Sequence, residues 1–179
     1  MIPAEWIEDV LRLKRFPRTG WLRVGVPAPE SVADHSFSAA LLGWRIARED
    51  KGLDASRVAL LLLVHDLHEA RLGDIPTPAK RYLPDGAVDA AERSIVQDQW
   101  AGDADGAALA REFLDGVTPE ARLARAVDNL EFILEAAARV RAGAAGPREM
   151  LTRARGGAAH AHPLTRPYVE AALSGPGAG

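Results

Sequence analysis

The segment LLLLVHDLHE, residues 60–69, joins a run of apolar side chains to the adjacent pair His65 and Asp66. Apolar residues at this density are typical of a helix that is buried on nearly all sides. Glu69 follows three residues after Asp66, and ionised groups in such a place are costly unless they have partners or bind a cation. We therefore interpret this segment as the floor of a metal site.

The length and composition of the chain fit a single domain without nucleic-acid or membrane partners. The 179 residues are enough for a sizeable core, and the net charge is only −3. Basic and acidic residues are interspersed, so there is no electrostatic signature of a nucleic acid polymer or an anionic membrane. The absence of cysteine excludes disulfides, thiolate metal sites and cysteine nucleophiles. Because the longest apolar run is too short to span a bilayer and the first residues form an amphipathic helix instead of a signal peptide, we expect a cytoplasmic protein.

Helical periodicity runs through most of the chain. Ser31 and Asp34 form a capping box at the start of one predicted helix, and Asp54 is a suitable N-cap for the next. The predicted helices cover residues 2–15, 32–51, 55–72, 87–100, 104–114, 119–142, 147–153 and 164–173. Residues 16–31 are predicted to form a loop, 74–78 a turn stiffened by two prolines, and 156–163 a flexible loop. No segment alternates with period two for long enough to form a strand, so we expect one all-α domain over residues 1–179, frayed after about residue 173.

Four side chains on three predicted helices are candidate ligands for one metal ion: His35, His65, Asp66 and Asp128. Mixed imidazole and carboxylate ligation suits a divalent ion and leaves Mn, Co, Mg, Fe, Ni and Zn open. Adjacent residues of a helix project about 100° apart, so His65 and Asp66 share an ion only at the edge of their helix. Ligands must then arrive from neighbouring helices, as in metal sites of helical bundles. Taken singly, each residue also fits a core histidine or a solvated acid.

Several short motifs stand in order along the chain and carry a resemblance. They are RTGW (18–21), ESVADHS (30–36), HDLHE (65–69), GDIPTP (73–78) and DNLE (128–131). Together they resemble the HD-domain metal-dependent phosphohydrolases, most closely their 5′-deoxynucleotidase branch, over roughly residues 15–137. The bare H…HD…D pattern is shared by many activities, whereas the ESVADH block and the GDIPTP turn are more specific to this branch.

The resemblance implies a single HD-domain helical bundle, with the metal held between helices by the four candidate ligands. It implies further that Glu69 and Asp74 are the catalytic carboxylates and that Arg18 holds the substrate phosphate. General chemistry agrees, because attack by a metal-bound water on phosphorus needs one group that accepts a proton and another that donates one to the leaving oxygen. A guanidinium can bind two phosphate oxygens at once. Which carboxylate is the acid stays open.

Other residues near this constellation have more than one interpretation. Trp21 is a ring that stacks on the base or excludes part of the sugar at the pocket mouth, or else a core residue. Thr77 is a hydrogen-bond partner of the substrate, or only of its own turn. His68 stands where the family usually carries a small residue, and we expect it to face solvent or to support the site from outside. The resemblance also implies a homodimer.

The expected function is hydrolysis of (deoxy)nucleoside 5′-monophosphates to nucleoside and phosphate. Three alternatives remain: an HD-type phosphodiesterase or alarmone hydrolase, a dinuclear iron oxygenase, and a non-catalytic helical module stabilised by its metal. The oxygenase needs further histidine ligands, for which the chain offers only His68 and the pair His160 and His162. A structural module closes its coordination shell, whereas four protein ligands on a six-coordinate ion leave room for water and phosphate.

Overall fold

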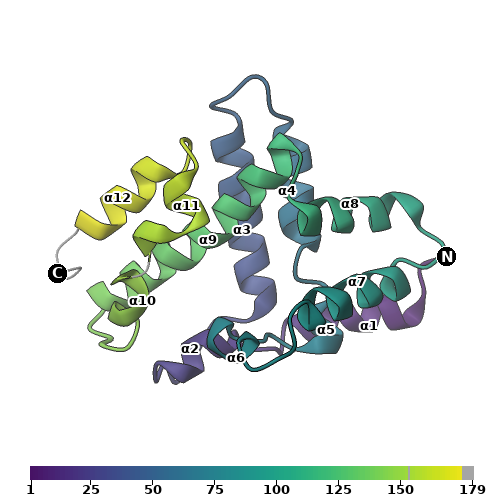
Figure 1. Cartoon of the computed structure of the whole chain (residues 1–179), viewed down its shortest axis with the longest axis horizontal. Coiled ribbons are helices and arrows are strands. Elements are labelled where there is room, and N and C mark those ends of the chain that lie inside the picture. The colour runs from purple at the N-terminus through teal and green to yellow at the C-terminus, as the bar shows by residue number, and fades with distance from the viewer. Residues whose placement is uncertain (153, 175–179) are drawn as a thin grey trace.

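The framework of the protein is entirely helical. A computed structural model describes residues 1–152 and 154–174, and every regular element among them is a helix, so the predicted all-α class is confirmed (Figure 1). The elements in chain order are α1 (Ala4–Leu13), α2 (Thr19–Arg23), α3 (Val32–Ala47), α4 (Ala55–Val64), α5 (Glu69–Leu72), α6 (Thr77–Lys80), α7 (Ala87–Gln99), α8 (Ala104–Asp115), α9 (Pro119–Arg141), α10 (Arg148–Thr152), the 3-10 helix η1 (Ala154–Gly156), α11 (Ala158–Ala161) and α12 (Arg166–Ser174). None of these helices combines the length and the apolar composition needed to cross a bilayer.

Helices α3, α4 and α9 form the centre of the molecule. Helix α3 packs along α4, and the long helix α9 crosses both (Figure 1). Gly43 allows α3 and α4 to approach closely, because a Cβ atom at this position would lie 2.3 Å from Cδ1 of Leu62. The main core is built on the faces that these helices turn toward one another, and Val58, Leu61 and Val127 in it are fully buried.

The remaining helices lie on either side of this centre. Helices α10, α11 and α12 pack on α9, while α1, α5, α7 and α8 form the other side (Figure 1). On that side Trp6 of α1 meets Trp100 at the end of α7 edge to face, with ring centroids 5.5 Å apart. The buried carboxylate of Asp9 accepts hydrogen bonds from Arg71 Nε at 2.7 Å and from Gln99 Nε2 at 3.0 Å. These bonds tie α5 to α1 and α7.

The predicted continuous helix over residues 55–72 is wrong in its middle. Helix α4 ends at Val64, and the chain passes through tight turns before α5 begins at Glu69. In these turns the amide of Leu67 donates to Val64 O and that of Glu69 to Asp66 O, which is the i to i+3 pattern of a 3-10 helix. The expectation that this helix is buried on nearly all sides is also wrong, because Leu60 and Leu63 are each 49 % exposed.

Three further expectations about local structure need correction. The predicted loop 16–31 contains the short helix α2, and the proline turn after Asp74 leads directly into the short helix α6. The segment 156–163 contains α11 instead of a flexible loop, because the fully buried Ala159 packs in the main core and its amide donates to Asn129 Oδ1 at 3.1 Å. The frayed tail was predicted from about residue 173, and residues 175–179 of it lie outside the described part of the chain.

Candidate metal centre and substrate pocket

His35 is fixed in place by the start of α3 and by a carboxylate on α9. The capping box predicted from Ser31 and Asp34 is present, and it begins the helix three residues before His35. The imidazole is fully buried, with Nδ1 at 2.6 Å from Glu131 Oε2 and Nε2 at 3.0 Å from Asp128 Oδ1. When the Glu131 oxygen accepts the Nδ1 proton, Nε2 presents its lone pair to the cluster.

His65 is oriented in the same way as His35, with a backbone oxygen in place of a carboxylate beside Nδ1. Its Nδ1 donates to the carbonyl oxygen of Leu62 at 2.7 Å, which fixes the ring at the end of α4. Its Nε2 is buried and has no hydrogen-bond partner within the described residues. This nitrogen lies 3.1 Å from Asp66 Oδ2 and 3.8 Å from Asp128 Oδ1. A buried nitrogen that faces two carboxylates in this way is suited to bind a cation.

The four predicted ligands come together and fit a divalent metal. The shortest distance between an imidazole nitrogen and a carboxylate oxygen of this set is 3.0 Å, between His35 Nε2 and Asp128 Oδ1. The longest is 3.9 Å, between His35 Nε2 and Asp66 Oδ2. Ligand atoms at about 2.1 Å from one ion, at right angles to each other, are about 3 Å apart. The unpartnered Nε2 of His65 and the mixed imidazole and carboxylate donors support the same conclusion.

The charges of these groups are strongly coupled. Burial disfavours the charged form of His65, but Asp66 and Asp128 outweigh it and raise the pKa of the imidazole well above its usual value. Burial likewise opposes ionisation of Asp128, yet the hydrogen bond with His35 and the nearby imidazole of His65 hold its pKa well below the usual range. The carboxylates therefore need positive charge beside them, which protons on the histidines or a bound cation can supply.

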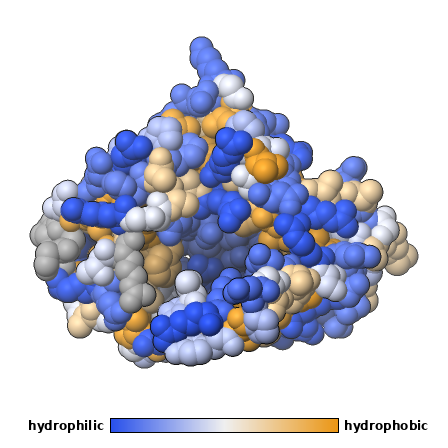
Figure 2. Space-filling model, viewed as in Figure 1, coloured by the Kyte–Doolittle hydropathy of each residue, from blue (hydrophilic) through white to orange (hydrophobic). Residues whose placement is uncertain are grey.

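A cavity of about 700 Å³ opens over this cluster, and both Asp66 and Asp128 line it. Figure 2 shows the hollow near the centre of the face, with mainly hydrophilic residues around it. Arg18, the residue before α2, lies in the wall and donates from Nη1 to Asp66 Oδ2 at 3.0 Å. Burial opposes its charge, but Asp66 and the neighbouring acids outweigh burial and raise the pKa of the guanidinium. Arg18 is therefore a cation at the edge of the metal cluster.

The two predicted catalytic carboxylates line the same cavity. Glu69 is only 8 % exposed, and burial, with Asp66 and Asp74 nearby, raises the pKa of its carboxyl to about 9. Its Oε2 has no hydrogen-bond partner in the described part of the chain. Asp74 is held differently, because its Oδ2 accepts from the amide of Thr19 at 2.5 Å and from the Thr19 hydroxyl at 3.1 Å. The two acids thus have contrasting environments at one opening.

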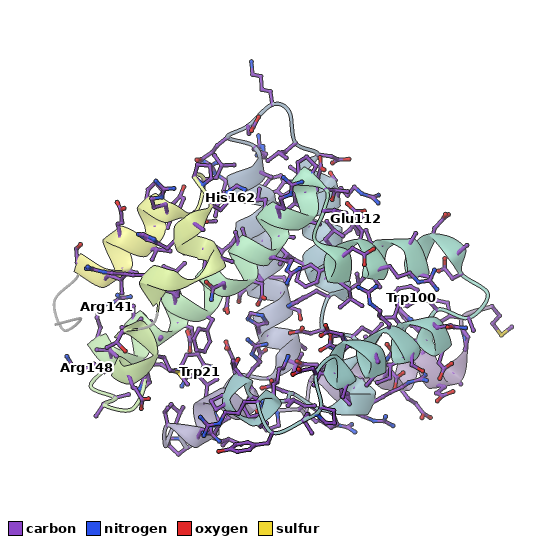
Figure 3. The ribbon with its side chains drawn as sticks, in the orientation of Figure 1. Trp21, Trp100, Glu112, Arg141, Arg148 and His162 are labelled. Carbon is purple, nitrogen blue, oxygen red and sulfur yellow. The ribbon has the colours of Figure 1, made fainter. Side chains whose placement is uncertain are left out.

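Trp21 and Thr77 both border the cavity, and their roles toward a substrate stay predictions. Trp21 belongs to α2, and its fully buried side chain points toward α9 (Figure 3). Its indole nitrogen donates to Glu30 Oε1 at 2.8 Å, and its ring stacks on Phe132 with centroids 4.9 Å apart. Trp21 therefore forms a wall of the cavity and is also a core residue. Thr77 is exposed at the start of α6.

The sequence did not predict the positions of two residues near the site, Glu131 and His68. Glu131 orients His35, and its only signal was its place one helical turn after Asp128. The expectation that His68 faces solvent is wrong, because this side chain is only 6 % exposed. Its Nε2 lies 3.6 Å from Glu92 Oε1 of α7, so it is enclosed between α5 and α7. Burial of this histidine depends on the position of α7, which its own motif does not encode.

Fold and site together define an all-helical protein with a histidine and aspartate cluster between its helices that is suited to hold a metal ion. The model of the HD domain family matches residues 10–156, and the chain belongs to this family. A 5′-deoxynucleotidase HDDC2 of Dictyostelium discoideum is 32 % identical over 135 residues, which are 70 % of this chain and 70 % of the relative. A protein of the same name from Danio rerio is 30 % identical over 74 % of this chain and 66 % of the relative. The chain thus spans about two thirds of the length of these relatives.

Solved structures show the same likeness. A protein from Pyrococcus horikoshii superposes with a TM-score of 0.76 at 32 % identity and covers 96 % of both chains. A conserved hypothetical protein from Pyrococcus furiosus superposes with a TM-score of 0.78 at 29 % identity and covers 95 % of this chain and 98 % of its own. The resemblance expected from the motifs, to HD-domain phosphohydrolases and their 5′-deoxynucleotidase branch, is confirmed.

Proposed function

We propose that the protein is a metal-dependent phosphohydrolase that cleaves (deoxy)nucleoside 5′-monophosphates to nucleoside and phosphate. The observation that carries this proposal is the meeting of three kinds of group at one cavity: the histidine and aspartate cluster, the cation Arg18, and the acids Glu69 and Asp74. The relatives named 5′-deoxynucleotidase support this choice of substrate.

The metal ligands in this proposal are His35, His65, Asp66 and Asp128. A divalent ion bound to them supplies positive charge that lowers the pKa of a coordinated water and polarises phosphoryl oxygens. The order of affinities among first-row metals does not decide which ion is native, so Mn, Co, Mg, Fe, Ni and Zn all remain to be tested.

The other residues handle the phosphate and the protons. Arg18 binds phosphate oxygens with its planar guanidinium. Glu69 keeps its proton at neutral pH, because burial and Asp66 raise its pKa to about 9, and we assign it as the donor to the departing 5′ oxygen. Asp74 is oriented by Thr19 and is assigned as the group that accepts a proton from the attacking water.

Phosphate release tests the proposal. Metal-stripped protein is assayed with ribo- and deoxyribonucleoside 5′-monophosphates after Mn, Co or Mg is added back. We expect release that depends on metal and is lost in Asp66→Ala and Glu69→Gln, whereas the exposed-residue controls Asp89→Ala and Glu8→Gln keep the wild-type rate. Absence of release from every nucleotide, by a folded protein that binds metal, would show that the proposal is wrong.

We also propose that the protein is a homodimer that pairs through an apolar face of α3 and α4. Phe37, Leu41 and Trp44 of α3 and Leu60 and Leu63 of α4 are between 38 % and 66 % exposed. The two helices pack side by side, and the α3 residues recur at helical spacing, so these side chains share one surface. Contiguous apolar surface of this kind marks interaction sites on soluble proteins.

Molar mass in solution tests the dimer. Light scattering after gel filtration should give twice the chain mass for the wild type and for Val117→Lys, which changes an exposed apolar residue outside α3 and α4. Leu63→Lys should give one chain mass, because a buried unpaired ammonium at the interface is unfavourable. A dimeric Leu63→Lys protein would place the interface elsewhere.

The cytoplasmic location and the lack of nucleic-acid and membrane partners stay predictions.

A further inference from the structure

The segment between Asp74 and helix α7 borders the cavity and has no buried side chain. Its residues 77–85, which we call the flap, comprise α6 and the loop that follows, at the lower edge of the view in Figure 1. None of residues 71–90, all of which the structure describes, is buried. The flap nevertheless forms part of the cavity wall, through Thr77, Pro78, Lys80 and Arg81.

The two ends of the flap are held more firmly than its middle. Before it, Asp74 accepts hydrogen bonds from the amide and the hydroxyl of Thr19. After it, Gly86 has a φ of 75°, which glycine adopts without steric cost, and precedes the first residue of α7. Within the flap the backbone bonds are local, as in the amide of Tyr82 that donates to Ala79 O at 3.1 Å. A segment with local hydrogen bonds and no buried side chain opens at a low cost in free energy.

Tyr82 of the flap presents a large aromatic ring to solvent. The residue is 76 % exposed. Arg81 covers one face of the ring, with its guanidinium carbon 4.7 Å from the ring centroid, and donates from Nη2 to the Tyr82 hydroxyl at 2.5 Å. Because Arg81 also lines the cavity, these contacts hold the ring at the cavity mouth. The face opposite Arg81 is open to a planar ligand.

The other aromatic rings at the cavity are less suited to stack on a ligand. Trp21 and Phe132 line the cavity, but each ring covers a face of the other, at a centroid distance of 4.9 Å. The guanidinium of Arg139 also lies over Trp21, 5.2 Å from the ring centroid. Trp21 is fully buried, whereas Tyr82 is largely exposed. Tyr82 is therefore the ring at this opening that is better placed to receive a nucleobase.

A different part of the cavity suits the phosphate. Arg18 lies there beside the metal cluster, with its Nη1 at 3.0 Å from Asp66 Oδ2. The cations of the flap are directed elsewhere, because Lys80 pairs with a carboxylate of α7 at 3.9 Å and Arg81 contacts Tyr82. A nucleotide with its phosphate at Arg18 has its base among the remaining walls of the cavity, and the flap is one of them.

We propose that the flap closes over a bound nucleotide and that Tyr82, oriented by Arg81, stacks on its base. The kind of ligand, a nucleoside 5′-monophosphate, rests on the proposed function. Segments that close over a substrate and exclude water are common in enzymes. Stacking tolerates any base, because every base has a π face. The flap thus selects phosphate esters that carry a base, purine or pyrimidine alike.

Steady-state kinetics of Tyr82→Ala test the contact with the base. The KM for deoxynucleoside 5′-monophosphates should rise at least about fivefold, the lower end of what loss of an aromatic partner costs a stacked base, while kcat changes little. Tyr82→Phe keeps the ring and should keep the wild-type KM. The matched control Tyr168→Ala removes an exposed tyrosine of α12 and should also leave KM unchanged.

A substrate without a base completes this test. Deoxyribose 5-phosphate has the same phosphate ester and sugar, so its KM should be equal in the wild type and in Tyr82→Ala. An unchanged nucleotide KM in Tyr82→Ala, or an equal rise with deoxyribose 5-phosphate, overturns the proposal. Because Tyr82 is exposed, its replacement leaves the core intact.

Limited proteolysis tests closure without reference to turnover. Trypsin cuts after Lys80 and Arg81, which are exposed on the flap, and after Lys51 in the exposed turn between α3 and α4. With Mn²⁺ present, a deoxynucleoside 5′-phosphonate, in which carbon replaces the departing oxygen, should slow the flap cuts several-fold and leave the cut at Lys51 unchanged. Inorganic phosphate, which has no nucleoside, should protect neither place. Equal protection by phosphate, or none by the phosphonate, overturns the proposal.

The two experiments distinguish failure of the flap contact from failure of the proposed function. If nucleotides are hydrolysed but the KM of Tyr82→Ala is unchanged, the function stands and the flap contact is wrong. If no nucleotide is hydrolysed, the proposed function is wrong, and protection by the phosphonate still decides whether the flap closes on a nucleotide.

Discussion

Replacing Glu131 by Gln should weaken metal binding although this residue does not touch the metal. Glu131 is 5 % exposed, and its Oε2 lies 2.6 Å from Nδ1 of His35. In the wild type this is a charge-assisted hydrogen bond, which increases electron density at the nitrogen that faces the ion. An amide oxygen of Gln still accepts the same proton, so the ring keeps its orientation and loses only the charge.

The expected loss follows from the difference between charged and neutral hydrogen bonds. A bond to a charged group contributes about 1.5–3 kcal/mol and a neutral one about 0.5–1.5 kcal/mol. The difference of about 1–1.5 kcal/mol corresponds to an increase in the metal dissociation constant of about 5- to 13-fold. This increase is near the lower end of the affinity losses usually seen when a residue that hydrogen-bonds to a metal ligand is changed.

Competition against a metal-binding dye, with Co²⁺ and chelator-stripped protein, measures this change. The matched control is Glu135→Gln, one helical turn later on α9, where the carboxylate pairs with Arg139 Nε at 2.7 Å. Both variants remove one negative charge from the same helix, so their difference isolates the contact with His35. An unchanged dissociation constant in Glu131→Gln, or an equal loss in Glu135→Gln, would refute the reasoning.

Three further predictions concern stability and are measured by urea unfolding. In chelator, the wild type should lose stability as pH rises from about 4.5 to about 9, by up to about 1.4 kcal/mol per pH unit, because native Glu69 keeps a proton that the unfolded chain releases. Glu69→Gln should remove that part of the slope, and an identical slope in both proteins would contradict the raised pKa. Gly43→Ala should cost about 1–3 kcal/mol, since its Cβ would lie 2.3 Å from Leu62 Cδ1, and an unchanged midpoint would refute this. Ser31→Ala removes the side-chain acceptor of the Asp34 amide and should cost about 1 kcal/mol, which an unaltered free energy of unfolding would exclude.

Helix starts with a side-chain cap were predictable because the signal is local. Ser31 and Asp34 bond each other across one turn, Asp54 accepts from the amides of Ser56 and Arg57, and Thr118 accepts from Ala121. Each of these contacts spans no more than three residues, so the sequence nearby contains all of it. The helices that begin at these caps were predicted with their starts in the correct place.

Exposure was harder to predict because it depends on packing partners far along the chain. Leu60 and Leu63 belong to the same apolar run as the buried Leu61 and Leu62. The two pairs differ in whether they lie on the side of α4 that packs against α3 and α9. Trp21 is a similar case, because its burial requires Phe132, more than a hundred residues away. Local patterns identify apolar residues but do not tell which face of a helix receives neighbours.

The break between α4 and α5 shows how an incorrect helix prediction bears on the site. In an α-helix, residues three apart are rotated by about 60° from each other, whereas in a 3-10 turn they eclipse. The amide of Glu69 donates to Asp66 O at 3.0 Å in the 3-10 pattern, which directs both side chains into the same cavity. Their proximity contributes, after burial, to the pKa of about 9 at Glu69. The tight turn that periodicity did not predict therefore has a chemical effect, since it forces two carboxylates together and leaves one of them needing a proton or a cation.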